Sequence, residues 1–405
     1  MSIHELKEKD LLDIEGVRLA TVEAGIRYKN RQDLVLMEIC PGSRVAGVFT
    51  KNAFRAAPVQ VAMDHLKASA GAIRYLLINT GNANAGTGQK GLEDALASCR
   101  YVAEAAGVDA NTVLPFSTGV IGENLPMDKI LAGVPKALAA LGGTWFDAAK
   151  GIMTTDTHPK GRSVTLTLAG KTVTITGVSK GAGMIKPNMA TMLSYVATDA
   201  DIAQAELQRM LSGCVDQSFN RITVDGDTST NDCCILIATG KSEVVLQAGS
   251  HDLEQFETAL RALVQDLAKD IIRDAEGGTK FVTVDIQGGK DTRECLLVAY
   301  AVAESPLVKT ALSASDPNWG RILAAVGRAG IEDLDVSGVE VYLGDVCIAE
   351  NGTRAASYTE EQGQEQMNKT DISITVKLGR GEAREVVWTS DFSEEYVRIN
   401  ASYRS

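Results

Sequence analysis

The sequence contains few of the residues that most often build catalytic or metal sites. Among 405 residues there are only four histidines, and none stands at metal-ligand spacing or in a motif that pairs it with a nucleophilic serine or cysteine. The seven cysteines are odd in number and scattered, with no C-x-x-C pair. A zinc site, a disulfide framework and a histidine base are therefore not expected, and the thiols are predicted to be reduced and mostly buried.

Long apolar runs, low-complexity segments and charge blocks are also missing. No run of 18 apolar residues occurs, and the start, MSIHELKEKD, is charged, so the sequence predicts neither a membrane span nor a signal peptide, and we expect a cytoplasmic protein. A net charge of −12 disfavours nucleic acid and anionic membranes as partners. The mean hydropathy of −0.01 and the length indicate a folded globular chain with two or more structural units.

Strands and helices are both abundant along the chain. Apolar positions at three- and four-residue spacing predict helices at 91–106, 127–141, 202–215 and 253–275. Short β-rich runs bounded by turn residues predict strands at 33–40, 45–50, 58–63, 74–79, 163–168, 173–178, 280–286, 295–302, 339–349 and 372–378. Because the strands come in consecutive runs, an α+β class with antiparallel or mixed sheets is favoured over a doubly wound parallel fold.

The most unusual segment is KGAGMIKPNMATMLSYVATDA, from Lys180 to Ala200. Its glycines permit tight turns, Pro187 stops a helix, and the residues after Thr191 have the pattern of a strand. A hydroxyl is thus expected at a junction between a loop and a strand. By itself this pattern also suits an ordinary glycine-rich loop before a strand.

The segment closely resembles the autoprocessing motif K-G-x-G-M-I-x-P-N-M-A-T-M-L of the ornithine acetyltransferases, also called glutamate N-acetyltransferases, of arginine biosynthesis. Further matches span nearly the whole chain in the family's order: GVFTKNAFRAAPV, INTGNANAGTG, FSTGVIGE, IMTTDTHPK, TVDGDTSTND, SDPNWGRI and the terminal YVRINASYRS. The resemblance implies acetyl transfer from N-acetylornithine to glutamate by a ping-pong reaction.

The resemblance also implies that the precursor cleaves its own Ala190–Thr191 bond and that Thr191 then becomes the nucleophile. The freed α-amine, with a pKa of roughly 7.7–8, can serve as the base, which removes the need for a histidine. The two fragments, 1–190 and 191–405, are expected to fold together into a layered α/β/β/α-type sandwich, and the family is usually a dimer of such pairs.

The resemblance places the oxyanion hole at Thr118 and Gly119, which would donate from a hydroxyl and from a backbone N–H. Fixed donors of this kind stabilise the charge that develops in acyl transfer. Without the resemblance, a tight turn after the strand VLPFS would be the simpler interpretation of these two residues.

Amino-acid substrates need at least one cation and one anion in the pocket. By resemblance, Lys180 and Glu276 join the catalytic set, and the substrate-binding residues are Thr154 or Thr155, Lys180, Thr191, Glu276, Asn400 and Ser405. Taken singly, each of these could be an ordinary exposed polar residue. Ser405 departs from the threonine that is common at the terminus in the family, and the double threonine leaves open which of Thr154 and Thr155 contacts substrate.

No cofactor is expected. Asp225, Asp227 and Asp232 could suggest a metal loop, but the spacing lacks the closing Glu of an EF-hand and the family is metal-free, so we assign them to turn and pocket structure. The motifs leave open whether acetyl-CoA also serves as a donor. Two rival functions stay open too: an N-terminal-nucleophile amidase or aminopeptidase that passes the acyl group to water, and an inactive ligand-binding scaffold.

Overall fold

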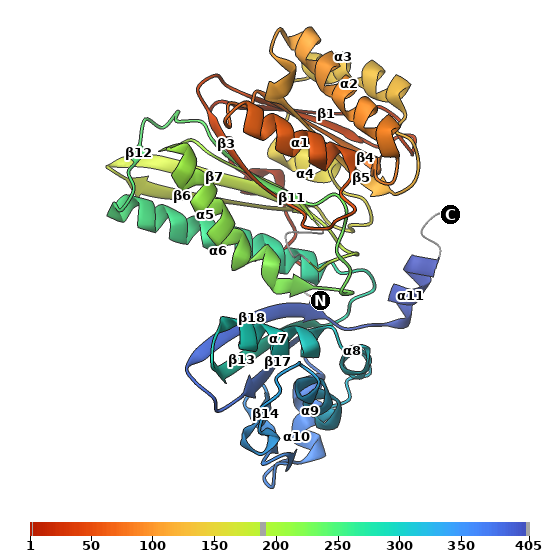
Figure 1. Cartoon of the computed structure of the whole chain (residues 1–405), viewed down its shortest axis with the longest axis vertical. Coiled ribbons are helices and arrows are strands. Elements are labelled where there is room, and N and C mark those ends of the chain that lie inside the picture. Colours follow the sequence, from red (N-terminus) through yellow and green to blue (C-terminus); the bar gives the residue numbers. More distant parts are fainter. Residues whose placement is uncertain (2, 187–191, 402–405) are drawn as a thin grey trace. The chain divides into compact units, whose positions relative to one another are not determined.

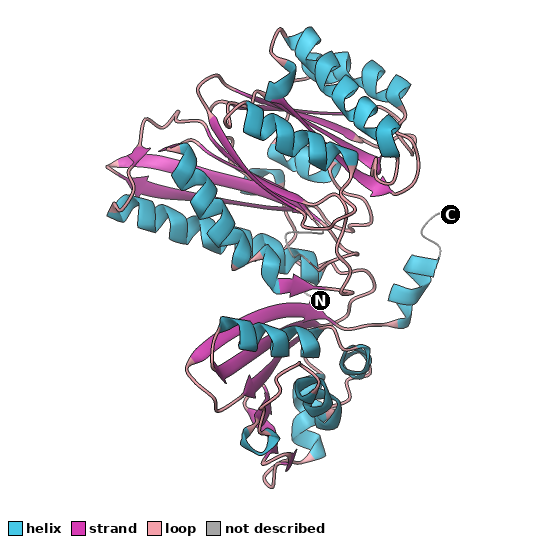
Figure 2. Ribbon diagram, in the orientation of Figure 1, coloured by secondary structure: helices cyan, strands magenta, loops and turns pink. Residues whose placement is uncertain are grey.

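The computed structural model describes residue 1, residues 3–186 and residues 192–401. The chain divides into two compact units, each described by itself. Unit 1 comprises residues 1–4, 221–226 and 272–405, and unit 2 comprises residues 5–220 and 227–271. As the sequence predicted, the chain is a mixed α/β protein with several mixed sheets (Figure 2).

The first sheet of unit 2, called sheet A, has the strand order β1-β2-β4-β5. Its strands are β1 (Val17–Val22), β2 (Leu34–Ile39), β4 (Tyr75–Asn82) and β5 (Val113–Val120). The strands β4 and β5 are parallel and the other pairs are antiparallel. Three helices cover its outer face through a continuous apolar cluster: α1 (Ala57–Ala68), α2 (Gly88–Ala106) and α3 (Met127–Ala139) (Figure 1).

The second sheet of unit 2, called sheet B, interleaves strands from both sides of the predicted cleavage site. Its order is β3-β11-β8-β7-β6. The strands are β3 (Arg44–Phe49), β6 (Lys160–Leu168), β7 (Lys171–Lys180), β8 (Leu193–Thr198) and β11 (Cys233–Ala238). Because β8 and β11 lie between β3 and β7, backbone hydrogen bonds join residues before position 190 to residues after it on both sides.

A shared apolar core lies between sheets A and B. It includes Phe116 of β5 and Tyr195 of β8, whose rings meet edge to face with centroids 5.4 Å apart. The short helix α4 (Trp145–Gly151) closes this core. On the other face of sheet B lie α5 (Gln204–Asp216) and α6 (His251–Arg273), so helices cover both outer faces of the paired sheets (Figure 1).

Unit 1 is built on a seven-stranded mixed sheet with the order β10-β18-β13-β17-β14-β15-β16. These strands are β10 (Ile222–Thr223), β13 (Phe281–Gly289), β14 (Glu340–Leu343), β15 (Val346–Glu350), β16 (Thr353–Arg354), β17 (Asp371–Lys377) and β18 (Ala383–Ser390). The helices are α7 (Thr292–Ala303), α8 (Pro306–Ser313), α9 (Trp319–Gly327), α10 (Glu360–Met367) and α11 (Glu394–Ala401). A small sheet in unit 2 pairs β9 (Asp201–Ile202) with β12 (Val245–Leu246).

Two predicted strands are wrong. Residues 58–63 belong to α1, where Pro58 lies in the first turn and is compatible with a helix start. Residues 295–302 belong to α7, which begins at an Asp291 cap that accepts a hydrogen bond from Glu294 N. Residues 295–302 form a continuous apolar run, which suits a buried helix as well as a buried strand, and residues 58–63 are a short apolar segment interrupted only by Gln60.

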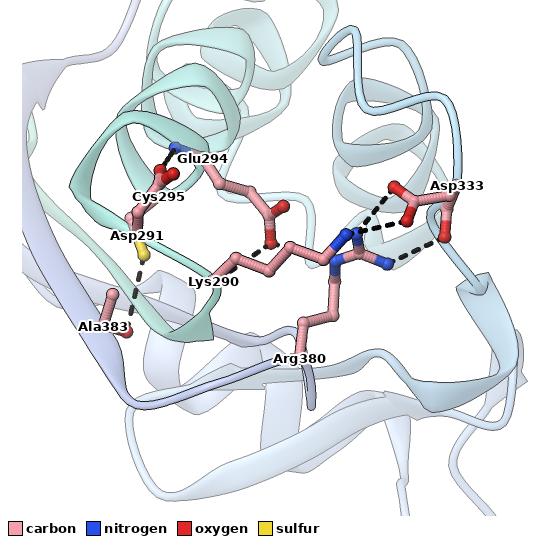
Figure 3. A network of polar contacts seen from close by, with 7 residues as sticks. All are labelled: Lys290, Asp291, Glu294, Cys295, Asp333, Arg380 and Ala383. Carbon is pink, nitrogen blue, oxygen red and sulfur yellow. Dashed lines mark hydrogen bonds and ion pairs between the residues drawn. The ribbon is translucent and has the colours of Figure 1, made fainter.

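A polar network ties the loops at one end of the unit 1 sheet (Figure 3). Arg380 Nε donates to Glu294 at 2.9 Å, and its terminal nitrogen meets Asp333 at 2.7 Å. Lys290 reaches the other oxygen of Asp333 at 2.7 Å. Since the Asp333 and Lys290 side chains are largely exposed, the ion pair between them contributes little to stability, and Lys290 provides a surface control below.

Within the described part of the chain, no single helix is long and apolar enough to cross a membrane. Only α7 and α8 together, across a 55° bend, reach that length and apolar content. All seven cysteines carry free thiols, and five of them are buried, as the sequence predicted.

Candidate active site

Thr118 and Gly119 lie near the end of β5, beside Thr80 and Gly81 of the parallel strand β4. Gly119 has φ of +135°, and a Cβ at this position would lie 2.3 Å from the carbonyl carbon of Gly81. Neither the backbone conformation nor the space admits a side chain. The end of β5 is therefore held close to β4 at Gly119, and Thr118, the residue before it, is buried.

Lys180 is the last residue of β7, and its ammonium donates to the Thr154 hydroxyl at 3.1 Å. Of the two adjacent threonines that the sequence left undecided, it is Thr154 that contacts Lys180. A cation and a hydroxyl are thus paired within unit 2. This arrangement suits recognition of a carboxylate, which accepts from both kinds of donor.

A buried carboxylate that the sequence interpretation missed organises this pair. Asp156 Oδ1 accepts from Lys160 Nζ at 2.7 Å and from Gly181 N at 2.6 Å, while Oδ2 accepts from Thr154 N at 3.0 Å. Burial by itself would raise the pKa of Asp156, but the charges of Lys160 and Lys180 and these hydrogen bonds hold that pKa below its usual range. Asp156 therefore stays ionised and fixes the residues next to Thr154 and Lys180.

We expect Asp156→Asn to reduce both stability and substrate affinity. The buried Lys160 ammonium would lose its carboxylate partner, which costs about 3–5 kcal/mol, and the Thr154–Lys180 pair would lose its support. Urea unfolding and steady-state kinetics measure the two effects. In the double variant Asp156→Asn, Lys160→Met, stability should largely return while the raised KM persists; a KM that returned with stability would contradict the positioning role.

Glu276 and Asn400 form the second pair, in unit 1. The Asn400 side-chain amide donates to Glu276 Oε2 at 2.9 Å, and Glu276 is almost fully buried. Next to Glu276, a Cβ on Gly277 would lie 2.4 Å from the backbone nitrogen of Tyr396, and Ser393 Oγ donates to Gly277 O at 2.6 Å. The carboxylate is thus held by close contact between the chain after α6 and the start of α11.

A buried lysine lies behind this segment. Lys309 is 0% exposed, its ammonium donates to Thr389 Oγ1 at 2.8 Å and to the Ser390 carbonyl, and it stands 4.6 Å from the centroid of the Phe392 ring. Burial lowers the pKa of Lys309 to about 7, although the charges of Asp391, Asp225 and Glu304 oppose this shift. Asp391 in turn accepts from Thr279 N at 2.7 Å, three residues after Glu276.

This lysine makes stability depend on pH. Because its folded-state pKa lies below the ordinary 10.5, the unfolded chain binds more protons between about pH 7 and pH 10, so the free energy of unfolding should rise with pH in that window. In Lys309→Met, the slope of the free energy of unfolding against pH should fall by up to about 1.4 kcal/mol per pH unit, because the contribution of one titrating proton is lost. Urea titrations at pH 7, 8 and 9 measure it, with Lys290→Met as the surface control; an unchanged slope in Lys309→Met would refute the assignment.

The structure brings together three sets of predicted residues: Thr118 with Gly119, Lys180 with Thr154, and Glu276 with Asn400. The first two sets belong to unit 2 and the third belongs to unit 1. Thr155 is half-buried next to Thr154. Ala190, Thr191 and Ser405 lie outside the described residues, so their predicted roles stay predictions.

Metal-binding groups do not cluster in the described residues, where no three His, Cys, Asp or Glu side chains come together as a metal site would require. Asp225 accepts from the Tyr396 hydroxyl at 3.3 Å in unit 1. The missed residue Asp156 had one signal in the sequence, because an Asp and a Lys four residues apart precede the strand predicted at 163–168.

The family match, the relatives and a solved structure all point to the same family of proteins. Residues 18–405 match the ArgJ family. Two relatives, each called arginine biosynthesis bifunctional protein ArgJ, come from Pseudomonas syringae pv. tomato and Pseudomonas fluorescens; each is 55% identical over 395 residues, which is 97% of this chain and 97% of the relative. A solved structure of arginine biosynthesis bifunctional protein ArgJ from Bacillus halodurans is 39% identical with a TM-score of 0.50, covering 53% of this chain and all of that chain.

Proposed function

Since this chain belongs to the ArgJ family, we propose that it is an acetyltransferase of arginine biosynthesis that moves an acetyl group from N-acetylornithine to glutamate. The family resemblance predicted from the sequence is confirmed. The observation that carries the proposed chemistry is the Thr118–Gly119 pair, a buried threonine followed by a glycine that the backbone of β4 approaches too closely for any side chain. Such fixed donors suit an acyl-transfer oxyanion.

The reaction begins with self-cleavage at Ala190–Thr191. The Thr191 hydroxyl attacks the Ala190 carbonyl, the peptide nitrogen leaves as the α-amine of Thr191, and water then hydrolyses the ester to free the Ala190 carboxylate. The new α-amine stays on the same residue as the hydroxyl, where in its neutral form it can accept the hydroxyl proton.

Acetyl transfer then proceeds in two steps, acylation of Thr191 and transfer of the acetyl group to glutamate. The Thr191 oxygen attacks the acetyl carbonyl of N-acetylornithine, Thr118 and Gly119 donate to the developing oxyanion, and ornithine leaves with the proton that the α-amine took. The amine of glutamate next attacks the acetyl-Thr191 ester, the bond between the acetyl carbon and the Thr191 oxygen breaks, and the α-amine carries the proton lost by glutamate to that oxygen. This releases N-acetylglutamate and restores the hydroxyl. No carrier group is required, because the acetyl group stays covalently bound throughout.

The substrate-binding residues supply both charges that an amino acid needs. Lys180 and the Thr154 hydroxyl suit a substrate carboxylate, and the Glu276 carboxylate, held by Asn400, suits an ammonium group. By family resemblance, we also assign Thr155 and Ser405 to substrate binding. Glu276 follows the C-terminal end of α6, where the helix dipole disfavours an anion, which supports a binding role over a role in helix stability.

The interleaving of sheet B supports fragments 1–190 and 191–405 that stay associated after cleavage. Breaking the chain at 190–191 leaves the β3–β11 and β7–β8 hydrogen bonds intact. We further propose the α/β/β/α sandwich for the layers of unit 2, a dimer of fragment pairs as the assembly and the cytoplasm as the location. Fragments of about 20 and about 23 kDa should co-purify without any dependence on reductant.

Acetyl-CoA is proposed as a second donor, since both relatives at 55% identity bear the name bifunctional. The decisive experiment assays N-acetylglutamate formation with each donor in turn and, by mass spectrometry, locates the acetyl adduct formed with N-acetylornithine alone. An adduct on the fragment that begins at Thr191 is expected. Hydrolysis faster than transfer to glutamate would favour the amidase rival, and the absence of any adduct or turnover would favour the inactive scaffold.

The pH profile of acetyl transfer tests which group is the base. If the base is the α-amine of Thr191, kcat/KM should rise through an apparent pKa near the ~7.7–8 of an α-amino group. A carboxylate base of ordinary pKa would complete that rise below about pH 6. Measured on cleaved protein, Glu276→Gln should mainly raise KM for the amino acid; if it removes the ascending limb and Thr191 acetylation together, Glu276 is the base instead.

A further inference from the structure

The loop Asp227–Asp232, whose aspartates the sequence analysis assigned to turn and pocket structure, contacts the backbone of β5. Asn231 is 6% exposed, and its side-chain nitrogen donates to two backbone carbonyls, Ala83 O at 2.6 Å and Ser117 O at 2.9 Å. Its side-chain oxygen accepts from the Thr230 hydroxyl at 2.5 Å. Both ends of the amide are therefore occupied, which fixes its orientation.

The Ser117 carbonyl belongs to the same planar peptide unit as the nitrogen of Thr118. Holding this oxygen therefore fixes the plane from which the Thr118 α-carbon and side chain depart. β5 is the edge strand of sheet A, and an edge strand leaves part of its backbone without a strand partner. Asn231 supplies a donor to one such carbonyl, one residue before the Thr118–Gly119 pair.

The second hydrogen bond of Asn231, to Ala83 O, connects β5 with the residue that follows β4. Ala83, whose carbonyl accepts from Asn231, itself donates through its N–H to Val120 O at 2.9 Å. The ladder between β4 and β5 is irregular between Gly81 and Asn82, next to Gly119. Asn231 thus bridges the two strands where regular pairing is interrupted.

We propose that Asn231 is a positioning residue of the oxyanion hole, acting through the Ser117–Thr118 peptide. The inference rests on the proposed function, because it assumes that Thr118 and Gly119 stabilise the oxyanion. It adds a residue from beyond the cleavage site, so the fragment 191–405 would contribute the support of a hole that lies in the fragment 1–190.

The test is the isosteric change Asn231→Asp, which replaces the donating nitrogen with an oxygen facing two carbonyls. A donor misplaced by about 1 Å can cost roughly 100-fold in rate. We expect kcat, per cleaved chain, to fall about 10- to 100-fold with KM for N-acetylornithine nearly unchanged. The matched control is Gln204→Glu, the same chemical change at an amide that donates to Val45 O on β3 at 2.9 Å, and its kcat should stay at the wild-type level.

A double-mutant cycle with Thr118→Val separates positioning from general destabilisation. If Asn231 acts through the Thr118 peptide, adding Asn231→Asp to Thr118→Val should slow the reaction far less than it slows the wild type. Fully multiplicative losses, or a wild-type kcat in Asn231→Asp, would overturn the inference. A wild-type kcat in Thr118→Val would instead overturn the proposed oxyanion hole.

Thermal unfolding is measured for each variant, so that a variant that no longer folds is recognised. If Asn231→Asp fails to unfold cooperatively, Asn231→Ala takes its place in the same cycle, because it removes the donor without placing a charge against the two carbonyls. The same two outcomes apply: a strongly non-additive loss of kcat supports the positioning role, and an additive loss or no loss refutes it.

Discussion

Replacing Thr191 with alanine is expected to leave the protein as a single chain of 43.0 kDa and to abolish acetyl transfer. One hydroxyl is proposed to attack both the Ala190 carbonyl and the acetyl group, so its removal blocks both reactions. Loss of a nucleophile that forms the covalent intermediate costs roughly 10⁴-fold or more in kcat. Gel electrophoresis reports cleavage, and N-acetylglutamate formation reports turnover.

The matched variant is Thr191→Ser, which keeps the hydroxyl and loses only a methyl group. It should retain measurable cleavage and measurable transfer, and its acetyl adduct should lie on the fragment that begins at residue 191. A Thr191→Ala protein that still cleaves, or an adduct on the other fragment in the wild type, would show that another residue is the nucleophile.

Replacing Gly119 with alanine is the second change expected to have a large effect. The new Cβ would lie 2.3 Å from the Gly81 carbonyl carbon and 2.6 Å from Asn82 N, so the strand ends must separate. The φ of +135° adds strain that an alanine rarely tolerates. Because the N–H of residue 119 would move from its position, we expect kcat to fall at least as far as for loss of one oxyanion donor, roughly 10²–10³-fold.

The control for this change is Gly122→Ala, three residues further along. Gly122 also has a positive φ, +84°, but a Cβ there meets nothing within 4 Å. This variant carries backbone strain of about 1–2 kcal/mol without the clash, so it should lose some stability and keep its kcat. Equal losses of kcat in both variants would mean that strain, and not the close approach to β4, explains the Gly119 effect.

Most of the secondary structure could be predicted from local patterns. The hairpin predicted at 163–168 and 173–178 is β6 and β7, and the long helix predicted at 253–275 is α6, because clear two- and four-residue periodicities mark these segments. The segments 58–63 and 295–302 are helical, although short apolar segments of this length also suit strands. The neighbouring elements that bury one face of each helix are part of the fold and are not contained in a local pattern.

The sequence predicted some residues of the candidate site and missed others. Lys180 with Thr154 and Glu276 with Asn400 were named from family motifs, and each pair is in hydrogen-bond contact within its unit. Asp156 and Asn231 were not singled out as site residues. Their roles depend on the backbone groups they contact, Gly181 N and Ser117 O, and the Asn231 contact joins residues 114 positions apart.

The family could be identified from the amino-acid sequence alone, because the unusual run KGAGMIKPNMATML and the other motifs are contiguous residues that need no spatial information to be read. The side chains that contact these motifs could be identified only from the fold. It interleaves β8 and β11 with β3 and β7, encloses the Asp156 carboxylate with two lysine charges, and presses Gly119 against β4. Burial and close backbone approach arise between segments far apart in the chain, and so they are properties of the fold and not of any local pattern.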